Sequence, residues 1–226
     1  MLAVRYYVQL GAAAKRSAGV FADRGIDVSG RTILRWVQKF RPALADAVRQ
    51  HRRRPDTTWL VDETYVKILG KWHYLYRGVD LDGQVLDCWL SRTRDLAAAL
   101  AFFRRTIGST GCTPEHVVTD KAAFYSSTIR TCAPHAKHTA TGFYNLVIST
   151  NRCERNHGYI KSRIRPMRGQ KSFACAKRLF PALDALQLVE RDFVRVPPVG
   201  APCTGGRSYV RARHIAAVIT QLGRPL

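Results

Sequence analysis

The spacing of apolar residues changes along the chain, and the middle of the sequence has the pattern of β-strands. Three segments there are rich in Val, Ile, Trp and Tyr and are separated by Gly70 and by the pair Asp82 and Gly83: residues 58–69, 72–79 and 85–90. Residues of this kind, interrupted by turn residues, predict a meander of three antiparallel strands with a tight second turn.

Helical and extended patterns alternate after this meander. Leu96, Leu100 and Phe103 are spaced to share one face of a helix over residues 94–107. A short strand, a helix, another short strand and a last helix are predicted next, at residues 116–119, 122–131, 135–139 and 151–172. Three antiparallel strands followed by helix, strand, helix, strand and helix is the order of the ribonuclease H-like fold. The predicted fold class is therefore α/β, with a ribonuclease H-like domain.

The N-terminal part of the chain has a helical pattern. Two short helices are predicted at residues 2–10 and 12–24, and a turn at 25–30 supplies Ser29 as the N-cap of a third helix, at 31–40. A third helix that follows a Gly-containing turn is typical of a small all-α helix-turn-helix domain.

The third helix has an apolar stripe and a polar outer face. Ile33, Val37 and Phe40 recur at helical spacing and form the stripe. The residues that lie largely off it are candidates for DNA contact: Arg31, Arg35, Gln38 and Lys39. Many three-helix packings share this pattern, but the basic charge of the segment favours a helix-turn-helix.

The net charge of +21 is unevenly distributed. Residues 1–54 carry +9, residues 55–150 carry +1, and residues 151–226 carry +11. The acids gather in the middle, between two basic arms, as expected of a protein that holds a polyanion across an acidic site. No apolar run approaches the roughly 20 residues of a membrane helix and no secretory signal is apparent, so we expect no membrane partner and a cytoplasmic, nucleoid-associated protein.

Changes in composition suggest four segments. A helix-turn-helix domain is expected at 1–50, a basic linker at 51–57, a catalytic domain at 58–194 and a basic tail at 195–226. The tail opens with a Pro-rich break, and residues 208–222 have the pattern of one more short helix.

Three carboxylates from separate predicted elements are the candidate catalytic residues. Asp62 lies inside the first strand, where an ionised acid is costly to bury unless it is paired or bound to metal. Asp120 ends the fourth strand, at the edge where α/β sheets place their chemistry. Glu154 begins the last helix, where Gly158 and Lys161 would share its face. Strand alternation sends Asp62 and its neighbour Glu63 to opposite faces, so we do not expect these two to act as a pair.

The three acids form a ligand set for divalent metal. Oxygen ligands of this kind suit a pair of Mg²⁺ ions, one activating the attacking oxygen and the other stabilising the leaving 3′ oxygen. Each acid also has a structural reading, Asp62 as a strand-end hydrogen-bond acceptor and Asp120 as a helix N-cap. A second metal hypothesis rests on the spacing of Cys132, His135 and His138, but a zinc site there lacks a fourth ligand.

Four stretches together resemble the DDE transposases of small bacterial and archaeal insertion sequences, and most closely their IS-six branch. They are WLVDETYVKILGKWHYLYRGVDLDGQVLDCWLS, RDLAAALAFFRR, VVTDKAAFY and CERNHGYIKSRIRPMRGQKS. The resemblance implies a helix-turn-helix ahead of a ribonuclease H-like core, with Asp62, Asp120 and Glu154 as a triad that binds Mg²⁺ or Mn²⁺. It also implies that Lys161 approaches DNA.

The resemblance implies a function and a set of partners. The expected activity is metal-dependent cleavage and strand transfer at the ends of an insertion sequence, by a homodimer or a larger oligomer. The expected partners are terminal inverted repeats and target DNA, held by the helix-turn-helix residues and by Lys161, Arg163, Arg165 and Arg168 of the basic stretch. The alternatives are a nuclease of the same fold that cuts without joining, and a non-catalytic DNA-binding protein derived from a transposase.

Overall fold

The structure is a computed structural model and describes residues 13–140, 151–165, 170 and 172–194. These residues fall into two compact units. The first contains the described residues up to Arg53, those of 162–170 and those from Arg178 onward; the second contains residues 54–161 and those of 171–177. The break between Arg53 and Arg54 lies inside the basic linker predicted at 51–57. The four functional segments stay a prediction.

The first unit contains the predicted pair of helices. Helix α2 (Ala14–Ala22) is followed by α3 (Gly30–His51), and the N-cap of α3 is Ser29, whose side chain accepts a hydrogen bond from the Thr32 N–H at 3.1 Å. Helix α3 is longer than the predicted 31–40, because buried Ala45 and Val48 continue its apolar stripe. The helices predicted at 2–10 and 208–222 lie outside the described residues.

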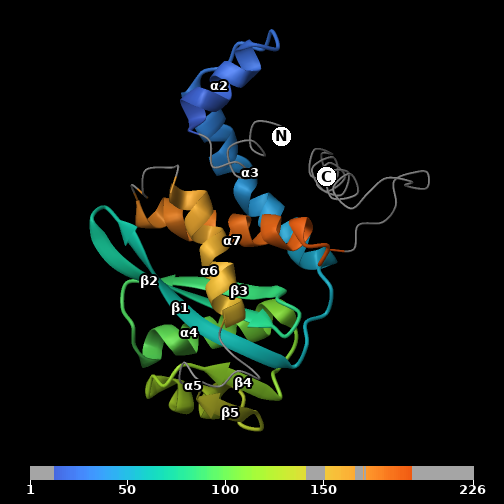
Figure 1. The fold of residues 1–226 in the computed structure, drawn as a ribbon, viewed down its shortest axis with the longest axis vertical. Helices are drawn as coiled ribbons and strands as arrows, with labels where there is room; N and C mark the ends of the chain where they lie inside the picture. Colours follow the sequence, from blue (N-terminus) through green and yellow to red (C-terminus); the bar gives the residue numbers. More distant parts are fainter. Residues whose placement is uncertain (1–12, 141–150, 166–169, 171, 195–226) are drawn as a thin grey trace, which may run out of the picture. The chain divides into compact units, whose positions relative to one another are not determined.

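The second unit is built on a five-stranded sheet. Its strands are β1 (Thr58–Ile68), β2 (Lys71–Asp80), β3 (Val85–Ser91), β4 (His116–Thr119) and β5 (Lys137–Ala140), in the order β3-β2-β1-β4-β5 (Figure 1). The first three strands pair antiparallel, and β4 and β5 run parallel to β1. The predicted ribonuclease H-like arrangement is therefore confirmed.

Two helices pack on the sheet and enclose the core of this unit. Helix α4 (Leu96–Thr110) contacts β2, β3 and α5 (Phe124–Cys132). Its N-cap, Asp95, accepts a hydrogen bond from the Ala98 N–H at 2.8 Å. The core between sheet and helices is largely aromatic and includes Trp59, Tyr76, Phe102, Phe103 and Tyr125. This core fixes the edge of the sheet at which β1 and β4 present their acids.

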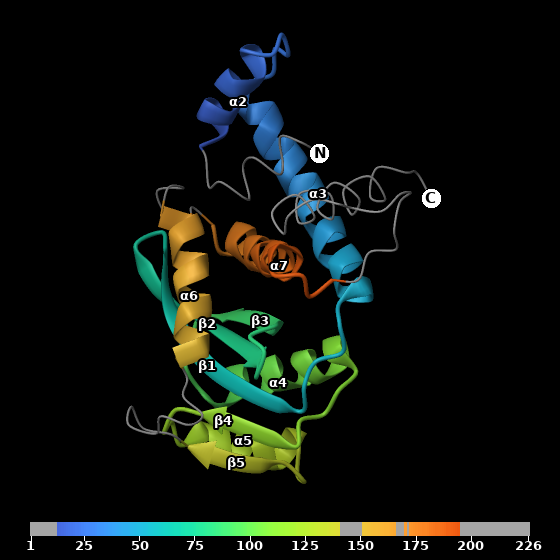
Figure 2. The same cartoon turned by 45° about the vertical axis from the view of Figure 1, so that its right-hand side comes forward.

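Helix α6 (Asn151–Ile164) is fastened to the sheet through the part that belongs to the second unit (Figure 2). The fully buried Arg77 of β2 donates from Nη1 to the Asn156 carbonyl oxygen at 2.6 Å. One turn earlier, the Cys153 thiol donates to the Leu60 carbonyl oxygen of β1 at 3.2 Å. These two contacts determine where the first turns of α6 lie relative to β1.

One helix was not among the predicted elements. Helix α7 (Phe173–Glu190) is buried at every position from 182 to 189, including Leu183 and Leu186, and contains Pro181. Burial on all sides of residues 182–189 leaves no clear stripe of period 3.6 there, and Pro181 argues against a helix in the sequence.

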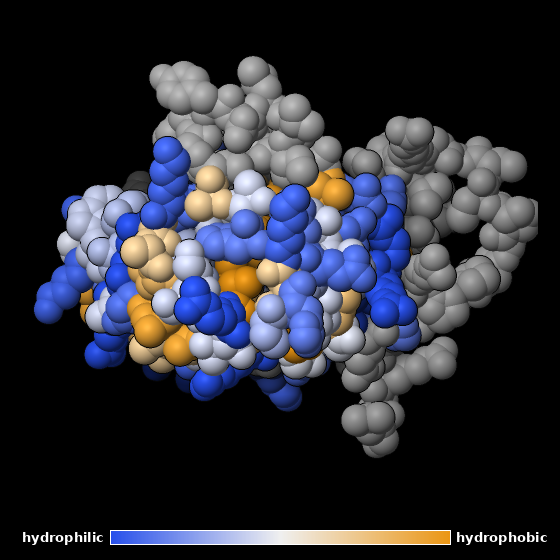
Figure 3. Space-filling model, turned by 90° about the horizontal axis from the view of Figure 1, so that it is seen from below, coloured by the Kyte–Doolittle hydropathy of each residue, from blue (hydrophilic) through white to orange (hydrophobic). Residues whose placement is uncertain are grey.

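Hydrophilic side chains cover much of the face seen in Figure 3, with apolar residues exposed between them. Six large hydrophobic side chains are exposed among the described residues, and three of them lie on or between β1 and β2: Tyr65, Leu69 and Trp72. No helix in the described part of the chain is long and apolar enough to cross a membrane.

Candidate active site

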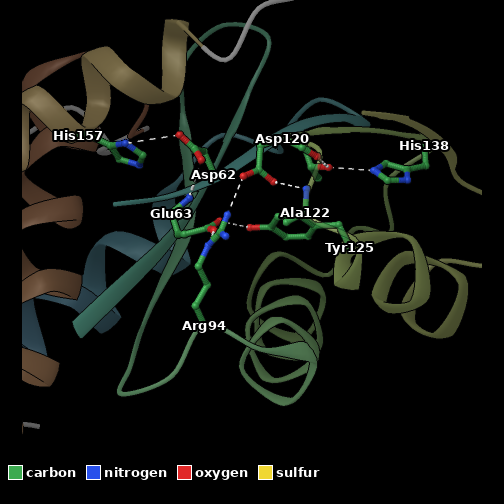
Figure 4. Close-up of polar contacts among 9 residues, drawn as sticks. Asp62, Glu63, Arg94, Asp120, Ala122, Tyr125, His138 and His157 are labelled. Carbon is green, nitrogen blue, oxygen red and sulfur yellow. Dashed lines mark hydrogen bonds and ion pairs between the residues drawn. The ribbon is translucent and has the colours of Figure 1, made fainter. Parts of the chain in front are cut away.

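Two of the three predicted acids meet at the edge of the sheet where β1 and β4 run side by side. Leu60 of β1 pairs with Val118 of β4, and the same register carried two residues further sets Asp62 beside Asp120. Oxygen atoms from Asp62, Glu63 and Asp120 all lie within 4.8 Å of one another (Figure 4). Parallel pairing of two strands thus converts two distant sequence positions into one acidic cluster.

Glu63 joins this cluster, although strand alternation led us to expect it apart from Asp62. The Asp62 Oδ1 atom accepts the backbone N–H of Glu63 at 2.9 Å, which holds the Asp62 carboxylate against its own strand. The Glu63 side chain is buried, and its two oxygens accept hydrogen bonds from Arg94 Nε and from the Tyr125 hydroxyl, the latter at 2.5 Å. Glu63 is therefore compensated by protein groups, as a buried carboxylate must be.

Arg94 connects Glu63 with Asp120. Its Nη2 atom donates to Asp120 Oδ2 at 2.7 Å, while the other Asp120 oxygen accepts the Ala122 N–H at 3.0 Å (Figure 4). The structural reading of Asp120 as a helix N-cap is wrong, because α5 begins at Phe124 with Ala123 as its N-cap; Asp120 instead accepts the Ala122 N–H in the turn before the helix. Sequence reasoning missed Arg94 and Tyr125, because their link to the acids depends on tertiary contacts; the one local signal was an arginine directly before the N-cap of α4.

The charge on Asp62 is poorly compensated by the protein itself. Burial, the most important cause, together with the negative charges of Glu63, Asp120 and Glu154, raises the pKa of Asp62 to about 7. Its hydrogen bond from the Glu63 N–H acts in the opposite direction but does not prevail. A carboxyl that resists ionisation beside other carboxylates is what a bound cation would relieve.

Glu154 interacts electrostatically with Asp62 of the acidic cluster. It lies in the first turn of α6 and is exposed, and its carboxylate is one of the charges that raise the pKa of Asp62. Gly158 and Lys161 are exposed on the same helix face, as predicted, while the opposite face is buried. Glu154 does not belong to the group of oxygens within 4.8 Å, which holds Asp62, Glu63 and Asp120.

His157 lies between α6 and the cluster as a neutral group. Its Nδ1 atom is 3.8 Å from Asp62 Oδ2. Burial first, and then the positive charges of Arg77 and Lys161, lower the pKa of His157 to about 3. The imidazole is therefore uncharged at neutral pH, and its approach to Asp62 is not an ion pair.

The predicted DNA-contacting residues are partly accessible. Those of α3, in the first unit, are all exposed: Arg31, Arg35, Gln38 and Lys39. Lys161 and Arg165 are exposed too, whereas Arg163 donates from Nη2 to both Glu190 oxygens at 3.1 and 3.3 Å. Arg168 lies outside the described residues.

The second metal hypothesis finds no support in the described residues. The His138 ring exchanges a hydrogen bond with the Thr119 hydroxyl at 2.9 Å, and its other nitrogen lies 3.4 Å from Ser126 Oγ. Among these residues, the group that could hold a metal is the cluster of Asp62, Glu63 and Asp120, not Cys132 with its histidines.

Comparison with known proteins decides the family. Residues 56–192 match a family model described as a DDE domain. The chain belongs to this DDE domain family. The match spans both Asp62 and Asp120 as well as Glu154, and it confirms the resemblance to DDE transposases of insertion sequences.

The relatives of this DDE domain protein include named transposases. It is 39% identical over 121 residues to the transposase for the insertion sequence-like element IS431mec of Staphylococcus aureus, and equally to the transposase of IS257 in transposon Tn4003 of the same organism. Each alignment covers 54% of this chain and 54% of the relative, so the chain spans about half the length of the curated relatives that it matches.

A search of solved structures gives more distant similarities. The HTLV-2 integrase catalytic core domain, solved in complex with magnesium, is 19% identical with a TM-score of 0.44, over 70% of this chain and 97% of that one.

Proposed function

We propose that this protein is a transposase that cleaves and joins DNA at the ends of an insertion sequence, with Asp62, Asp120 and Glu154 as its catalytic carboxylates. The observation that supports this most is the meeting of Asp62 and Asp120 on adjacent parallel strands, with the charge of Glu154 acting on Asp62. Membership of the DDE domain family supports the same assignment.

The donor set fits a divalent cation, and we propose Mg²⁺, with Mn²⁺ as a substitute. Hard oxygen ligands suit these ions, and the raised pKa of Asp62, caused first by burial and then by neighbouring negative charges, supports a site that a bound cation would stabilise. Asp62, Asp120 and Glu154 would hold the metal. Glu63 is buried and both of its oxygens accept from Arg94 and Tyr125, whereas Asp120, which also accepts from Arg94, is partly exposed. When bound, the metal supplies positive charge for the phosphate oxygens and for the attacking and leaving oxygens.

The protein groups around the acids have positioning roles in this proposal. Arg94 holds one oxygen of Asp120 and the Ala122 N–H holds the other, so the carboxylate keeps one orientation. Neutral His157 adds no competing positive charge beside Asp62. In the reaction, a water or 3′ hydroxyl oxygen forms a new bond to phosphorus while the bond from phosphorus to the leaving 3′ oxygen breaks.

The basic surfaces would bind the DNA. We propose that α3 reads the terminal inverted repeats through Arg31, Arg35, Gln38 and Lys39, and that Lys161, Arg163, Arg165 and Arg168 contact backbone phosphates. The exposure of the α3 residues and of Lys161 and Arg165 supports this, whereas Arg163 would have to share its guanidinium with Glu190. Joining two ends calls for a homodimer or a larger assembly, acting on the DNA of the nucleoid.

Strand transfer tests the proposal. A labelled, pre-cleaved element end is incubated with plasmid DNA and Mg²⁺, using the wild type, Asp120→Asn, and Asp82→Asn as a matched control on the exposed β2–β3 turn. We expect joining by the wild type and the control and none by Asp120→Asn. Equal joining by all three proteins would show that Asp120 is not a catalytic residue.

Two other outcomes would replace the proposed function. Metal-dependent cutting of uncleaved ends without any joining would indicate a nuclease of the same fold. Specific binding of the ends with neither cutting nor joining would indicate a DNA-binding protein derived from a transposase.

A further inference from the structure

The hairpin formed by β1 and β2 is longer than the sheet that supports it. Strand β4 pairs with β1 only from Thr58 to Leu60, and β3 reaches no further along β2 than Tyr74. Residues 65–74, here called the hairpin arm, therefore run out from the sheet as two strands and their turn, drawn in teal in Figures 1 and 2. A two-stranded arm is marginally stable alone and needs packing on one face.

The two faces of the hairpin arm differ. Val66, Ile68 and His73 point to one face and are buried, and the His73 ring lies 5.3 Å from the ring of Phe173. The residues between them point to the other face, where Tyr65 is 53% and Trp72 61% exposed. Packing thus accounts for the first face; on the second face Tyr65 and Trp72 are largely in solvent, while Tyr74 is partly buried against the core.

The exposed face carries a row of aromatic rings. Tyr65 pairs across the strands with Tyr74, with 5.2 Å between ring centroids, and its ring meets that of Trp72 edge-on at 6.2 Å. Lys67 Nζ lies 5.5 Å from the centroid of the Trp72 ring. Cross-strand aromatic pairs help a hairpin to form, but this role does not require rings that are more than half exposed.

The hairpin arm is positively charged and begins beside the acidic cluster. It contains Lys67 and Lys71 and no acid. Glu63, a member of the cluster, precedes Tyr65 by two residues on the same face of β1, a rise of roughly 7 Å along a strand. DNA whose phosphate lies at the cluster would have its neighbouring nucleotides next to these rings and to Lys67, which pairs with Trp72; Lys71 pairs with Ile68 and lies on the other face.

We propose that the hairpin arm is a stacking platform for an unpaired base of the DNA held at the active site. The inference rests on the proposed function, since it takes DNA as the substrate. Exposed rings on a basic surface stack on bases without reading their sequence, and Lys67, on the same face as the rings, attracts the phosphates between them. Bases inside a duplex do not expose their faces, so the ligand is a single-stranded overhang or a base displaced near the cut.

Binding of two DNAs tests the proposal. One is a fluorescein-labelled duplex with a three-nucleotide single-stranded overhang at the element end, and the other is a blunt duplex of the same total length. We expect Trp72→Ala to weaken binding of the overhang DNA about tenfold, the effect of losing one stacked base, and to leave the blunt duplex within about twofold. Trp72→Phe keeps a ring and should retain most of the affinity.

Leu69→Asn is the matched control. Leu69 is 70% exposed at the turn of the arm, has no ring, and has a φ of 50°, which asparagine tolerates. It should leave the binding of both DNAs unchanged. As a direct readout, 5-iodouracil placed in the overhang should crosslink on irradiation to a peptide that contains Tyr65, Trp72 or Tyr74.

Three results would overturn the proposal. They are equal losses on blunt and overhang DNA in Trp72→Ala, crosslinks that map outside the arm, or a lower molar mass in solution for both Leu69→Asn and Trp72→Ala. The last would make the arm a contact with a second copy of the chain. Failure of the wild type to join ends, with the arm crosslinks retained, would instead refute the proposed function and leave the platform standing.

Discussion

The Asp62 carboxyl is more stable protonated than ionised up to near neutral pH. Its pKa is raised from 3.8 to about 7, so the folded protein binds a proton there that the unfolded chain releases near pH 4. The stabilisation from this proton is complete below about pH 4 and is lost as the pH rises through 7. In metal-free protein at pH 8, ionised Asp62 therefore weakens the fold.

Asp62→Asn should stabilise the metal-free protein at high pH. Because asparagine has no charge, we expect its free energy of unfolding at pH 8 to exceed that of the wild type by about 2 to 4 kcal/mol, with the difference vanishing below pH 4. Urea unfolding in EDTA at the two pH values measures this. A difference that does not change with pH would mean that the Asp62 charge is not the cause.

Arg94 compensates one acid and orients another, and the two roles can be separated. Arg94→Gln leaves the Glu63 charge buried and should cost about 2 kcal/mol of stability, reduced from the value for a fully buried pair because Arg94 is one-third exposed. It should also lower strand transfer at least tenfold, because Asp120 loses its Nη2 partner.

The double variant Glu63→Gln, Arg94→Gln supplies the control for this pair. It should regain most of the stability, since no uncompensated charge remains buried, yet stay poor in strand transfer. Recovery of both properties together would show that Arg94 acts only as the counter-ion of Glu63.

At the scale of single residues, the sequence predicted the acids whose positions follow from the strand pattern. Asp62 inside a strand and Asp120 at a strand end were recognisable, because adjacent parallel strands present such positions at one edge of the sheet. The hydrogen bonds from Arg94 and Tyr125 to Glu63 could not be predicted from the sequence, because these residues lie 31 and 62 positions away from Glu63. Alternation along β1 also gave no sign that the Asp62 carboxylate would bend back to the Glu63 N–H.

Among the elements, α6 depends on the buried Arg77 for its attachment to β2, while the Cys153 thiol attaches it to β1. Arg77→Met removes the donor to the Asn156 carbonyl, so the first turns of α6, with Glu154, should detach from β2. We expect faster amide hydrogen exchange over residues 151–161, unchanged exchange in the core helix α4, and at least tenfold slower strand transfer.

Arg105→Met serves as the comparison for Arg77→Met. Arg105 pairs with buried Asp87 at 3.0 Å, away from α6, so its loss should destabilise the fold without changing exchange in α6. Equal acceleration over α6 in both variants would mean that Arg77 contributes only to global stability.

The predictability of each element followed from its amphipathicity. Strands β1 to β4 were predicted to within two residues at each end, because one or both of their faces are apolar and turn residues bound them. Helix α3 extends eleven residues past its predicted end, through Pro42, since tertiary burial of Ala45 and Val48 outweighs the local signal. Helix α7 was missed because residues 182–189 are buried on all sides, which gives no helical period, and because Pro181 interrupts the pattern.

For the whole molecule, the net charge of +21 leads us to expect that the proposed DNA binding weakens steeply with salt. If six to ten phosphates are contacted, affinity should fall about 10³- to 10⁵-fold between 50 and 200 mM salt. Lys161→Ala should reduce the slope of log affinity against log salt by about one for any sequence. Gln38→Ala should leave the slope unchanged and reduce the preference for the terminal repeat. Salt titrations of binding to terminal-repeat DNA and to random DNA measure the slope and the preference. Equal effects of the two variants on the slope would refute the assignment of Lys161 to phosphate contact and Gln38 to sequence reading.

The pairing of β1 with β4 also has a consequence for the order of folding. The meander of β1, β2 and β3 is local in sequence, whereas Thr58 meets His116 only after a long loop, containing two strands and α4, has closed. We expect pulse-labelled amides of the meander to be protected before those of β4. A newly made chain would then complete its meander while Asp62 still has no Asp120 beside it, so the acidic cluster of the proposed active site would form only after the β1–β4 contact.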